Sequence, residues 1–160
     1  MEKIECQTCF KNKTALRCGD CEEPTCKVCS YFIDDTVFEY AELLPESVKD
    51  KTFCTPCYHK NADPILEEYK EYLEAAKNIN VYSSIQGNET GMIRRIEKPI
   101  MVKECNDQEE ALMLLAFYAA KKGYDTLVDV DIKSTKTGKG TYQKLIWTGR
   151  GVPVDPKIKK

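Results

Sequence analysis

Apolar residues recur every three or four positions in a segment near the middle of the chain. They are Ile65, Tyr69, Tyr72, Leu73 and Ala76. Spacing of this kind places apolar side chains on one face of a helix, so the pattern predicts a helix over residues 62–78. Pro64 suits its first turn, where a backbone N–H has no partner within the helix. We expect this helix to connect two separate parts of the chain.

Beyond residue 79 the pattern changes to short extended segments with one further helix. The predicted strands are Val81–Ile85, Ile93–Val102, Thr126–Lys133 and Thr141–Gly149. Asp107 followed by Glu110 forms a capping-box pattern and predicts a helix over Gln108–Lys122 that ends at Gly123. Apolar residues cover much of the circumference of this helix, which indicates that it is buried against a sheet.

The last two strands predict a β-hairpin with a glycine-rich tip at Ser134–Gly140. Alternation along its first strand directs three residues toward the core, namely Val128, Val130 and Ile132. The other face carries three carboxylates, namely Asp125, Asp129 and Asp131. Such a group could hold a metal ion or perform acid–base chemistry, but exposure to solvent explains the pattern more simply.

Eight of the nine cysteines form four Cys-x-x-Cys pairs within the first 57 residues. The pairs are Cys6/Cys9, Cys18/Cys21, Cys26/Cys29 and Cys54/Cys57. A two-residue gap lets two thiolates bind one tetrahedral ion, and two pairs complete a closed four-thiolate zinc site. The sequence therefore predicts two structural zinc ions per chain. The chain opens without an apolar signal region, which favours zinc over disulfides, and disulfides or an iron–sulfur cluster are the weaker alternatives.

The spacing between the pairs bears on which of them share an ion. Only four residues separate the second pair from the third, too few for a hinge between two separate zinc ribbons. This gap favours interleaved ligation, in which pairs one and three bind one ion and pairs two and four bind the other. The ligands would be Cys6, Cys9, Cys26 and Cys29 for the first zinc, and Cys18, Cys21, Cys54 and Cys57 for the second. Sequential ligation stays open as the alternative.

With this spacing, residues 6–57 resemble the FYVE/PHD superfamily of cross-brace zinc fingers. For FYVE domains the resemblance implies binding of phosphatidylinositol 3-phosphate through an R-R/K-H-H-C-R motif. Residues 15–20 stand at that place, read A-L-R-C-G-D and contain no histidine. Lys11, Lys13 and Arg17 keep a small basic face, so weak peripheral contact with an anionic membrane is an alternative hypothesis.

Two other activities of cross-brace fingers match this chain less well. PHD fingers that bind histone tails carry Trp two residues before the last pair, where this chain has Thr52. RING-type ubiquitin ligases have apolar spacers in the first pair, where it has Gln7 and Thr8. A ligase role and an uncharacterised enzyme are therefore weaker alternatives. The residues on which an enzyme would depend are Asp129, Asp131 and Cys105.

Between the third and fourth cysteine pairs, the segment Ser30–Phe53 is rich in apolar residues. They are Tyr31, Phe32, Ile33, Val37, Phe38, Tyr40, Leu43 and Leu44. A zinc module has little core of its own, so we expect these residues to pack over the metal sites or against the second half of the chain. An exposed patch for a protein partner is the alternative.

The second half is similar, over Glu110–Val154, to the YbjQ-type bacterial domain. The residues that carry the resemblance are Gly123, Asp125, Val128, Val130, Ile132, Gly149 and Val152. Such domains form symmetric homo-oligomers, so the resemblance implies oligomerisation through residues 79–155. The resemblance does not imply a dedicated metal site in this chain, because Cys105 has no histidine near it in the sequence. We expect Cys105 to be a buried thiol.

Charge and hydropathy narrow the classes of partner. Residues 1–60 carry eight Lys or Arg against eleven Asp or Glu. Two four-thiolate zinc sites would each add two negative charges and bring this module to about −7. Because phosphate backbones are bound through Lys and Arg, we expect no nucleic-acid ligand. The longest apolar run, Ala111–Ala120, is about half of a membrane span, which predicts a cytoplasmic protein without a transmembrane segment.

The predicted fold class is α+β, with a two-zinc cross-brace finger joined by a helix to a small antiparallel sheet that carries a helix. The predicted boundaries are 1–61 for the finger, 62–78 for the connector helix, 79–155 for the second domain and 156–160 for a flexible basic tail. The predicted function is a zinc-stabilised, non-enzymatic module that binds a protein partner and is multimerised by its second domain. We assign no catalytic residues.

Overall fold

The computed structural model describes residues 4–11, 13–33, 40 and 43–160. The fold is α+β, as the sequence predicts, with a two-stranded antiparallel sheet, a four-stranded mixed sheet, helices and two clusters of cysteines. The chain divides into two compact units, residues 1–70 and 71–160. Among the helices that the structure describes, none combines the length and the apolar character needed to cross a membrane.

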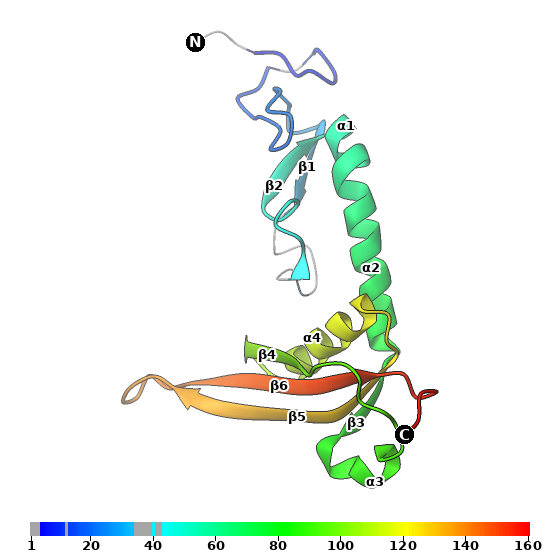
Figure 1. Ribbon diagram of the computed structural model, residues 1–160. Coiled ribbons are helices and arrows are strands. Elements are labelled where there is room, and N and C mark those ends of the chain that lie inside the picture. Colours follow the sequence, from blue (N-terminus) through cyan, green and yellow to red (C-terminus); the bar gives the residue numbers. More distant parts are fainter. Residues whose placement is uncertain (1–3, 12, 34–39, 41–42) are drawn as a thin grey trace. The chain divides into compact units, whose positions relative to one another are not determined.

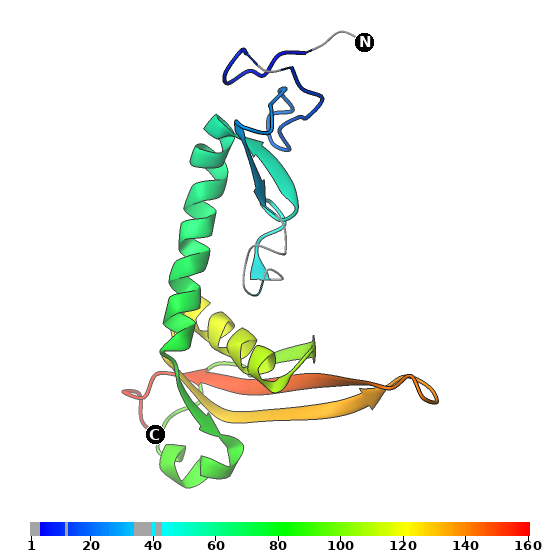
Figure 2. The ribbon, with the colours of Figure 1, turned by 180° about the vertical axis from the view of Figure 1, so that it is seen from behind.

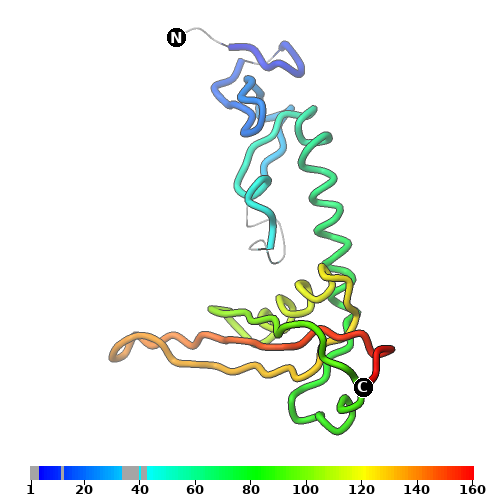
Figure 3. Tube along the Cα trace, in the orientation of Figure 1, coloured from blue at the N-terminus to red at the C-terminus, as the bar shows by residue number. Residues whose placement is uncertain are grey.

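In the first unit, strands β1 (Ser30–Ile33) and β2 (Lys51–Cys54) pair antiparallel. The chain then enters the short helix α1 (Thr55–Cys57), a π-helical turn η2 (Tyr58–Ala62) and the long helix α2 (Asp63–Lys77), a path that Figure 3 traces without interruption. Helix α2 occupies nearly the range of the predicted connector, and the boundary between the two units falls inside it.

The apolar segment between the third and fourth cysteine pairs supplies part of the core of this unit. Ile33 and Leu44 are buried, at 3% and 4% exposure. Phe32 is half exposed, and Tyr31 stacks on the ring of Tyr58 with the ring centroids 3.9 Å apart. Val37 and Phe38 lie outside the described residues. Part of the segment is therefore core, as expected, and other apolar side chains of it reach the surface.

The second unit is built on a four-stranded sheet in the order β3-β5-β6-β4, shown in Figure 1. Its elements are β3 (Asn80–Ser83), the 3₁₀ turn η3 (Ser84–Gln86), α3 (Gly87–Thr90), β4 (Ile100–Cys105), α4 (Gln108–Lys121), β5 (Thr126–Thr137) and β6 (Lys144–Val154). Strand β6 runs antiparallel to both of its neighbours, β4 and β5, but β3 runs parallel to β5. The sheet is thus mixed, whereas the sequence pattern predicts an antiparallel one.

Helix α4 lies across one face of this sheet (Figure 1). At its start, the Asp107 carboxylate accepts a hydrogen bond of 2.7 Å from the backbone N–H of Glu110, which satisfies a donor that the helix leaves free. After its end, Gly123 adopts a φ of +85°, a conformation that favours glycine. Gly149 of β6 provides room beneath the helix, because a Cβ there would lie 3.0 Å from the Leu115 side chain.

A β-bulge near the middle of β5 overturns the predicted alternation. Asp129 has a φ of +54°, and the pairing of β5 with β6 shifts register between Val128 and Asp131. Val128 packs with Val152 on the face away from α4, whereas Val130 lies near Gly151 on the α4 face. The prediction that Val128 and Val130 share a face was wrong, because the extra residue of a bulge reverses the alternation beyond it.

The ends of three other segments also differ from the predicted ends. The predicted strand Ile93–Val102 is a strand only from Ile100, just after Pro99, whose ring cannot donate to a sheet. Strand β5 continues to Thr137, beyond its predicted end at Lys133, whereas β6 begins at Lys144 instead of Thr141 and continues to Val154. The last residues, predicted as a flexible tail, form a bridge in which the Lys160 N–H donates to the Met92 carbonyl at 2.9 Å.

Candidate metal centres

The eight paired cysteines gather into two groups of four. One group contains Cys6, Cys9, Cys26 and Cys29, and the other contains Cys18, Cys21, Cys54 and Cys57. Within each group all four sulfur atoms lie within 4.8 Å of one another. These are the interleaved sets that the four-residue gap favours, and the structure does not bring together the sequential sets.

The sulfur–sulfur distances fit a metal ion at the centre of each group. The Sγ atoms of Cys9 and Cys26 are 3.9 Å apart, and those of Cys21 and Cys54 are 3.8 Å apart. A tetrahedral ion with Zn–S bonds of about 2.3 Å separates its sulfurs by about 3.8 Å, whereas a disulfide would bring them to about 2.0 Å. Each group could therefore hold one metal ion, and four thiolates are a donor set typical of structural zinc.

The first cysteine of each of the two N-terminal pairs opens a tight turn. The Cys6 carbonyl accepts the N–H of Phe10 at 2.9 Å, and the Cys18 carbonyl accepts the N–H of Glu22 at 3.1 Å. Both turns end in a residue with positive φ, +56° at Phe10 and +62° at Glu22. The turn aims both sulfurs of a pair to the same side, which a two-residue spacer in an extended strand could not do.

Backbone hydrogen bonds outside these turns impose the interleaved order. The N–H of Gln7, inside the first pair, donates to Pro24, just before the third pair, at 2.9 Å. The N–H of Gly19, inside the second pair, donates to Thr52 of β2, just before the fourth pair, at 2.7 Å. A side chain at Gly19 would press on that same carbonyl oxygen at 3.3 Å. Pairs one and three, and pairs two and four, are thereby brought side by side.

Two of the thiols have environments that favour the thiolate. Burial raises the pKa of Cys6, but backbone N–H groups, led by that of Cys9, donate to its sulfur and bring the pKa down to about 6. Burial likewise raises the pKa of Cys18, and the N–H groups of Cys21 and Asp20 help to lower it to about 7. The Asp20 nitrogen lies 3.4 Å from the Cys18 sulfur. Metal ligation needs thiolates, and these hydrogen bonds stabilise them.

In each group one thiol in particular resists losing its proton. The hydrogen bond to the Cys26 thiol, together with burial, raises the pKa of Cys29 to about 12. Burial and the hydrogen bond to the Cys54 thiol raise the pKa of Cys57 as well. Four adjacent sulfurs cannot all be negative unless a cation neutralises them. A divalent ion would supply that charge and deprotonate the remaining thiols.

Side chains also connect the two groups to each other, a feature that cysteine spacing could not reveal. The Gln7 amide, within the first pair, donates to the Cys21 sulfur of the other group at 3.6 Å. The Thr55 hydroxyl, within the fourth pair, donates to the Cys29 carbonyl at 2.8 Å. Within the second group, Asn61 of η2 donates to the Asp20 carboxylate. The polar spacer Gln7 is the one signal in the sequence that could have suggested such a contact.

Part of the predicted basic face lies beside the first cysteine group. Lys11, Lys13 and Arg17 are all exposed, and the Arg17 guanidinium donates to the Glu22 carbonyl at 3.0 Å. Lys13 lines an open cavity of about 470 Å³ next to this group. The other lining residues are Thr14, Ala15, Leu16, Cys26, Lys27 and Val28. The structure thus adds Lys27 to this face, while Lys11 and Arg17 are outside the lining of the cavity.

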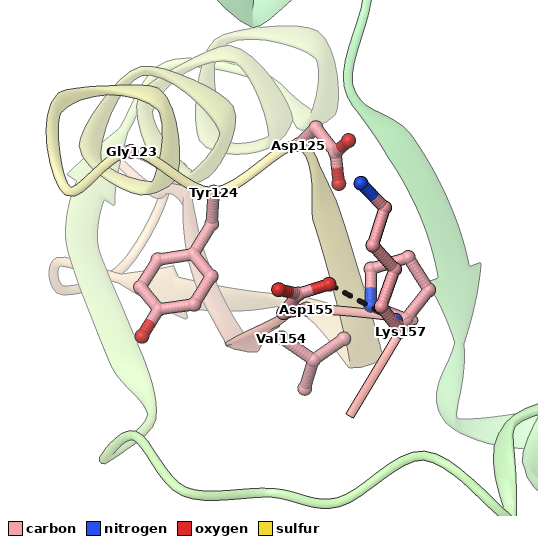
Figure 4. Close-up of a pocket in the computed structure, with 7 residues that line it drawn as sticks. Gly123, Tyr124, Asp125, Val154, Asp155 and Lys157 are labelled. Atoms are coloured by element: carbon pink, nitrogen blue, oxygen red, sulfur yellow. Dashed lines mark hydrogen bonds between the residues drawn. The ribbon is translucent and has the colours of Figure 1, made fainter. Parts of the chain in front are cut away.

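The three aspartates of the second unit do not form a site. Asp125 borders a cavity of about 260 Å³ with Asp155 and Lys157, shown in Figure 4. Asp129 is held by Arg95, and the Asp131 carboxylate lies 2.8 Å from the Lys133 ammonium. The described residues therefore show these carboxylates in three separate environments. The three do not share the face that the sequence alternation predicts.

Cys105, the ninth cysteine, lies apart from both groups at the end of β4. Its side chain is 1% exposed, and its sulfur lies 3.7 Å from the Lys103 carbonyl oxygen. It pairs across the sheet with Trp147. This position is that of a core residue, as expected for a buried thiol.

Comparisons with known proteins add no evidence to these geometrical observations. No protein-family model, no curated protein and no solved structure matched the chain. Both cysteine groups are compatible with cross-brace zinc sites on their geometry alone.

Proposed function

We propose that this chain is a zinc-stabilised, non-enzymatic module that binds a protein partner through surfaces beside its first metal site. The observation that carries the proposal is the pair of four-cysteine groups. Four thiolates complete the tetrahedral coordination of zinc, so neither ion has a position open to water or substrate. An ion held in this way supplies folding free energy rather than chemistry. This arrangement also supports the resemblance to cross-brace fingers.

Exposed apolar side chains beside the first metal site support an interaction surface. Phe10, directly after Cys9, is 71% exposed, and Val28, inside the third pair, is 84% exposed. Val28 also lines the open cavity beside this site. Large apolar side chains held on rigid, metal-fixed turns can bind a partner with little loss of conformational entropy. We therefore propose Phe10 and Val28 as the anchors of the surface.

Affinity capture with the zinc-containing full chain tests this function. We expect a protein from cell extract to be retained by the wild type and lost with the double variant Phe10→Ser/Val28→Ser. Ile85→Ser is the matched control, because Ile85 is 94% exposed but belongs to the other unit. Metal content would show that each variant still folds. Equal capture by the double variant and the wild type would exclude this surface.

Contact with anionic membranes is a second candidate for the same surface. It is supported by the exposed lysine Lys11 beside Phe10 and by Lys13 and Lys27 around the cavity. Sedimentation with phosphoinositide-containing vesicles tests it. We expect binding that is lost when Lys11, Lys13 and Arg17 are all replaced by Gln. Vesicle binding that survives these changes would eliminate the basic face as a lipid site.

We also propose that residues 79–155 multimerise the chain, which would present several zinc modules together and raise avidity. The exposed Met101 on β4, an edge strand, supports this proposal, since it is 62% exposed. Native mass spectrometry counts the subunits directly. A monomer at micromolar concentration would refute multimerisation and leave the protein-binding proposal intact.

A further inference from the structure

Residues 132–154 of the β5–β6 hairpin carry positive charge and no negative charge, although the first of their lysines, Lys133, lies 2.8 Å from the Asp131 carboxylate. Residues 132–154 contain five Lys or Arg and no Asp or Glu. They are Lys133, Lys136, Lys139, Lys144 and Arg150, and all five are exposed. In a chain whose net charge is −2, this segment stands out as the electrostatic footprint of a polyanion-binding surface.

The hairpin projects beyond the strands that flank it, as Figures 1 and 2 show from opposite sides. Strand β3 pairs with β5 only as far as Val130, and β4 pairs with β6 only as far as Trp147. Beyond these residues, in the described part of the chain, β5 and β6 pair with each other alone down to Thr137 and Lys144. We call residues 133–145 the hairpin arm. It is a two-stranded ribbon that is open on both edges.

The composition of the arm matches the groups that contact nucleic-acid backbones. Every residue from 133 to 144 is Lys, Ser, Thr, Gly, Tyr or Gln. Lysine ammonium groups and the hydroxyls and amides of the other polar residues donate hydrogen bonds to phosphate oxygens. Tyr142 at the tip is 89% exposed. Its carbonyl approaches Gly138 so closely that a Cβ there would overlap it, which fixes the shape of the tip.

A second explanation of these lysines is protection of the open strand edges. Charged side chains discourage another strand from pairing with an edge. Edge protection does not require that acidic residues be excluded, nor an exposed tyrosine at the tip. An acidic protein partner also fits the charge, but the arm lacks the apolar centre that protein interfaces have. The composition therefore favours a phosphate backbone.

We propose that the hairpin arm binds duplex DNA, with the ribbon in the major groove and its lysines at the phosphates. The major groove of B-DNA is about 12 Å wide and admits a two-stranded β-ribbon, whereas the corresponding groove of an RNA duplex is too narrow for side chains to read. The expectation that the chain has no nucleic-acid ligand rests on the acidic residues 1–60, and the arm belongs to the other unit. The proposal does not depend on the zinc-dependent function.

Fluorescence anisotropy of a short labelled DNA duplex tests the proposal with the full-length, zinc-containing protein. Between roughly 50 and 200 mM salt, four lysine–phosphate contacts make the affinity fall by about 100-fold. The variant K133Q/K136Q/K139Q/K144Q should bind at least tenfold more weakly at low salt. Its slope of log affinity against log salt should be smaller by about one for each lysine removed.

A matched control distinguishes an effect of the arm on DNA affinity from an effect of the net charge of the whole chain. K60Q/K70Q/K98Q/K121Q removes four exposed lysines outside the arm and should keep the affinity and the slope of the wild type. Circular dichroism would show that both variants are folded. The proposal is overturned if the wild type does not bind DNA, if both variants lose affinity equally, or if the arm variant binds as the wild type does. Equal affinity for single-stranded DNA, duplex RNA or polyglutamate would also overturn it.

Discussion

Arg95 and Asp129 form a two-pronged ion pair at the bulge of β5. Arg95 Nε donates to Asp129 Oδ2 at 2.8 Å, and Nη2 donates to Oδ1 at 3.0 Å. The same guanidinium donates to the Thr90 and Ile93 carbonyls at 2.9 and 2.8 Å. One side chain thus ties the bulged strand to the segment between α3 and β4. The pair stabilises a bulge whose backbone conformation is unusual for aspartate.

Asp129→Asn should destabilise the second unit by about 1–3 kcal/mol at neutral pH, because the Arg95 guanidinium then lacks its counter-charge. Asparagine tolerates the positive φ of this position, so the change removes the charge and not the backbone conformation. Trp147, the chain's single tryptophan, lies in β6 and would report unfolding of this unit in denaturant.

The effect of this substitution should depend on pH. The hydrogen bonds from Arg95 lower the pKa of Asp129 below its usual value. A carboxyl with a lowered pKa stabilises the fold above its unfolded pKa of about 3.9, and the stabilisation is lost as pH falls through the folded pKa. The difference between wild type and variant should therefore be constant above about pH 5 and shrink below about pH 4. A difference that persists unchanged in acid would contradict the ion-pair explanation.

The chain should bind two zinc ions, one in each cysteine group. Native mass spectrometry of protein purified without added metal would count them. We expect two ions for the wild type and for Cys105→Ser, whose sulfur lies outside both groups. Cys29→Ser should retain fewer, because three thiolates and a hydroxyl bind zinc more weakly than four thiolates. A wild-type mass lower by the hydrogens of disulfides, with no metal, would refute the metal sites.

Gln7 should strengthen the metal site to which its own cysteine pair does not belong. Its amide donates to the Cys21 sulfur at 3.6 Å, and hydrogen bonds to ligands raise metal affinity by about tenfold or more. Gln7→Ala should therefore speed the release of one of the two ions to a chelator by about tenfold.

The neighbouring residue Thr8 provides the control for that experiment. Its hydroxyl is buried and has no hydrogen-bond partner among the described residues. Thr8→Ala removes an unsatisfied polar group in the same turn and should leave metal release unchanged or slower. If Thr8→Ala and Gln7→Ala released metal at the same rate, the contact between Gln7 and Cys21 would have no effect on metal binding.

The sequence predicted the metal centres in more detail than it predicted the sheet, for a physical reason. Two-residue gaps and one short spacer leave few ways for eight thiols to surround two ions, so local spacing favours the observed grouping and leaves only sequential ligation as the alternative. The bulge at Asp129 and the parallel pairing of β3 depend on contacts between distant residues, such as Arg95 with Asp129. The spacing of apolar residues along the chain does not report such contacts. The alternation of Val128 and Val130 therefore predicted, wrongly, that the two share a face.

Gly149 should be intolerant of a side chain, because helix α4 packs directly over it. An added Cβ would lie 3.0 Å from Leu115 and 3.1 Å from Val102, both of which are buried. Neither neighbour can move without disturbing the core, so Gly149→Ala should cost about 1–3 kcal/mol of unfolding free energy. Gly87→Ala is the control, since Gly87 begins α3 and a Cβ added there would meet nothing within 4 Å. There, alanine should be neutral or stabilise by up to about 1 kcal/mol. Denaturant unfolding followed by Trp147 fluorescence measures both, and equal effects of the two substitutions would show that α4 does not rest on β6 as described.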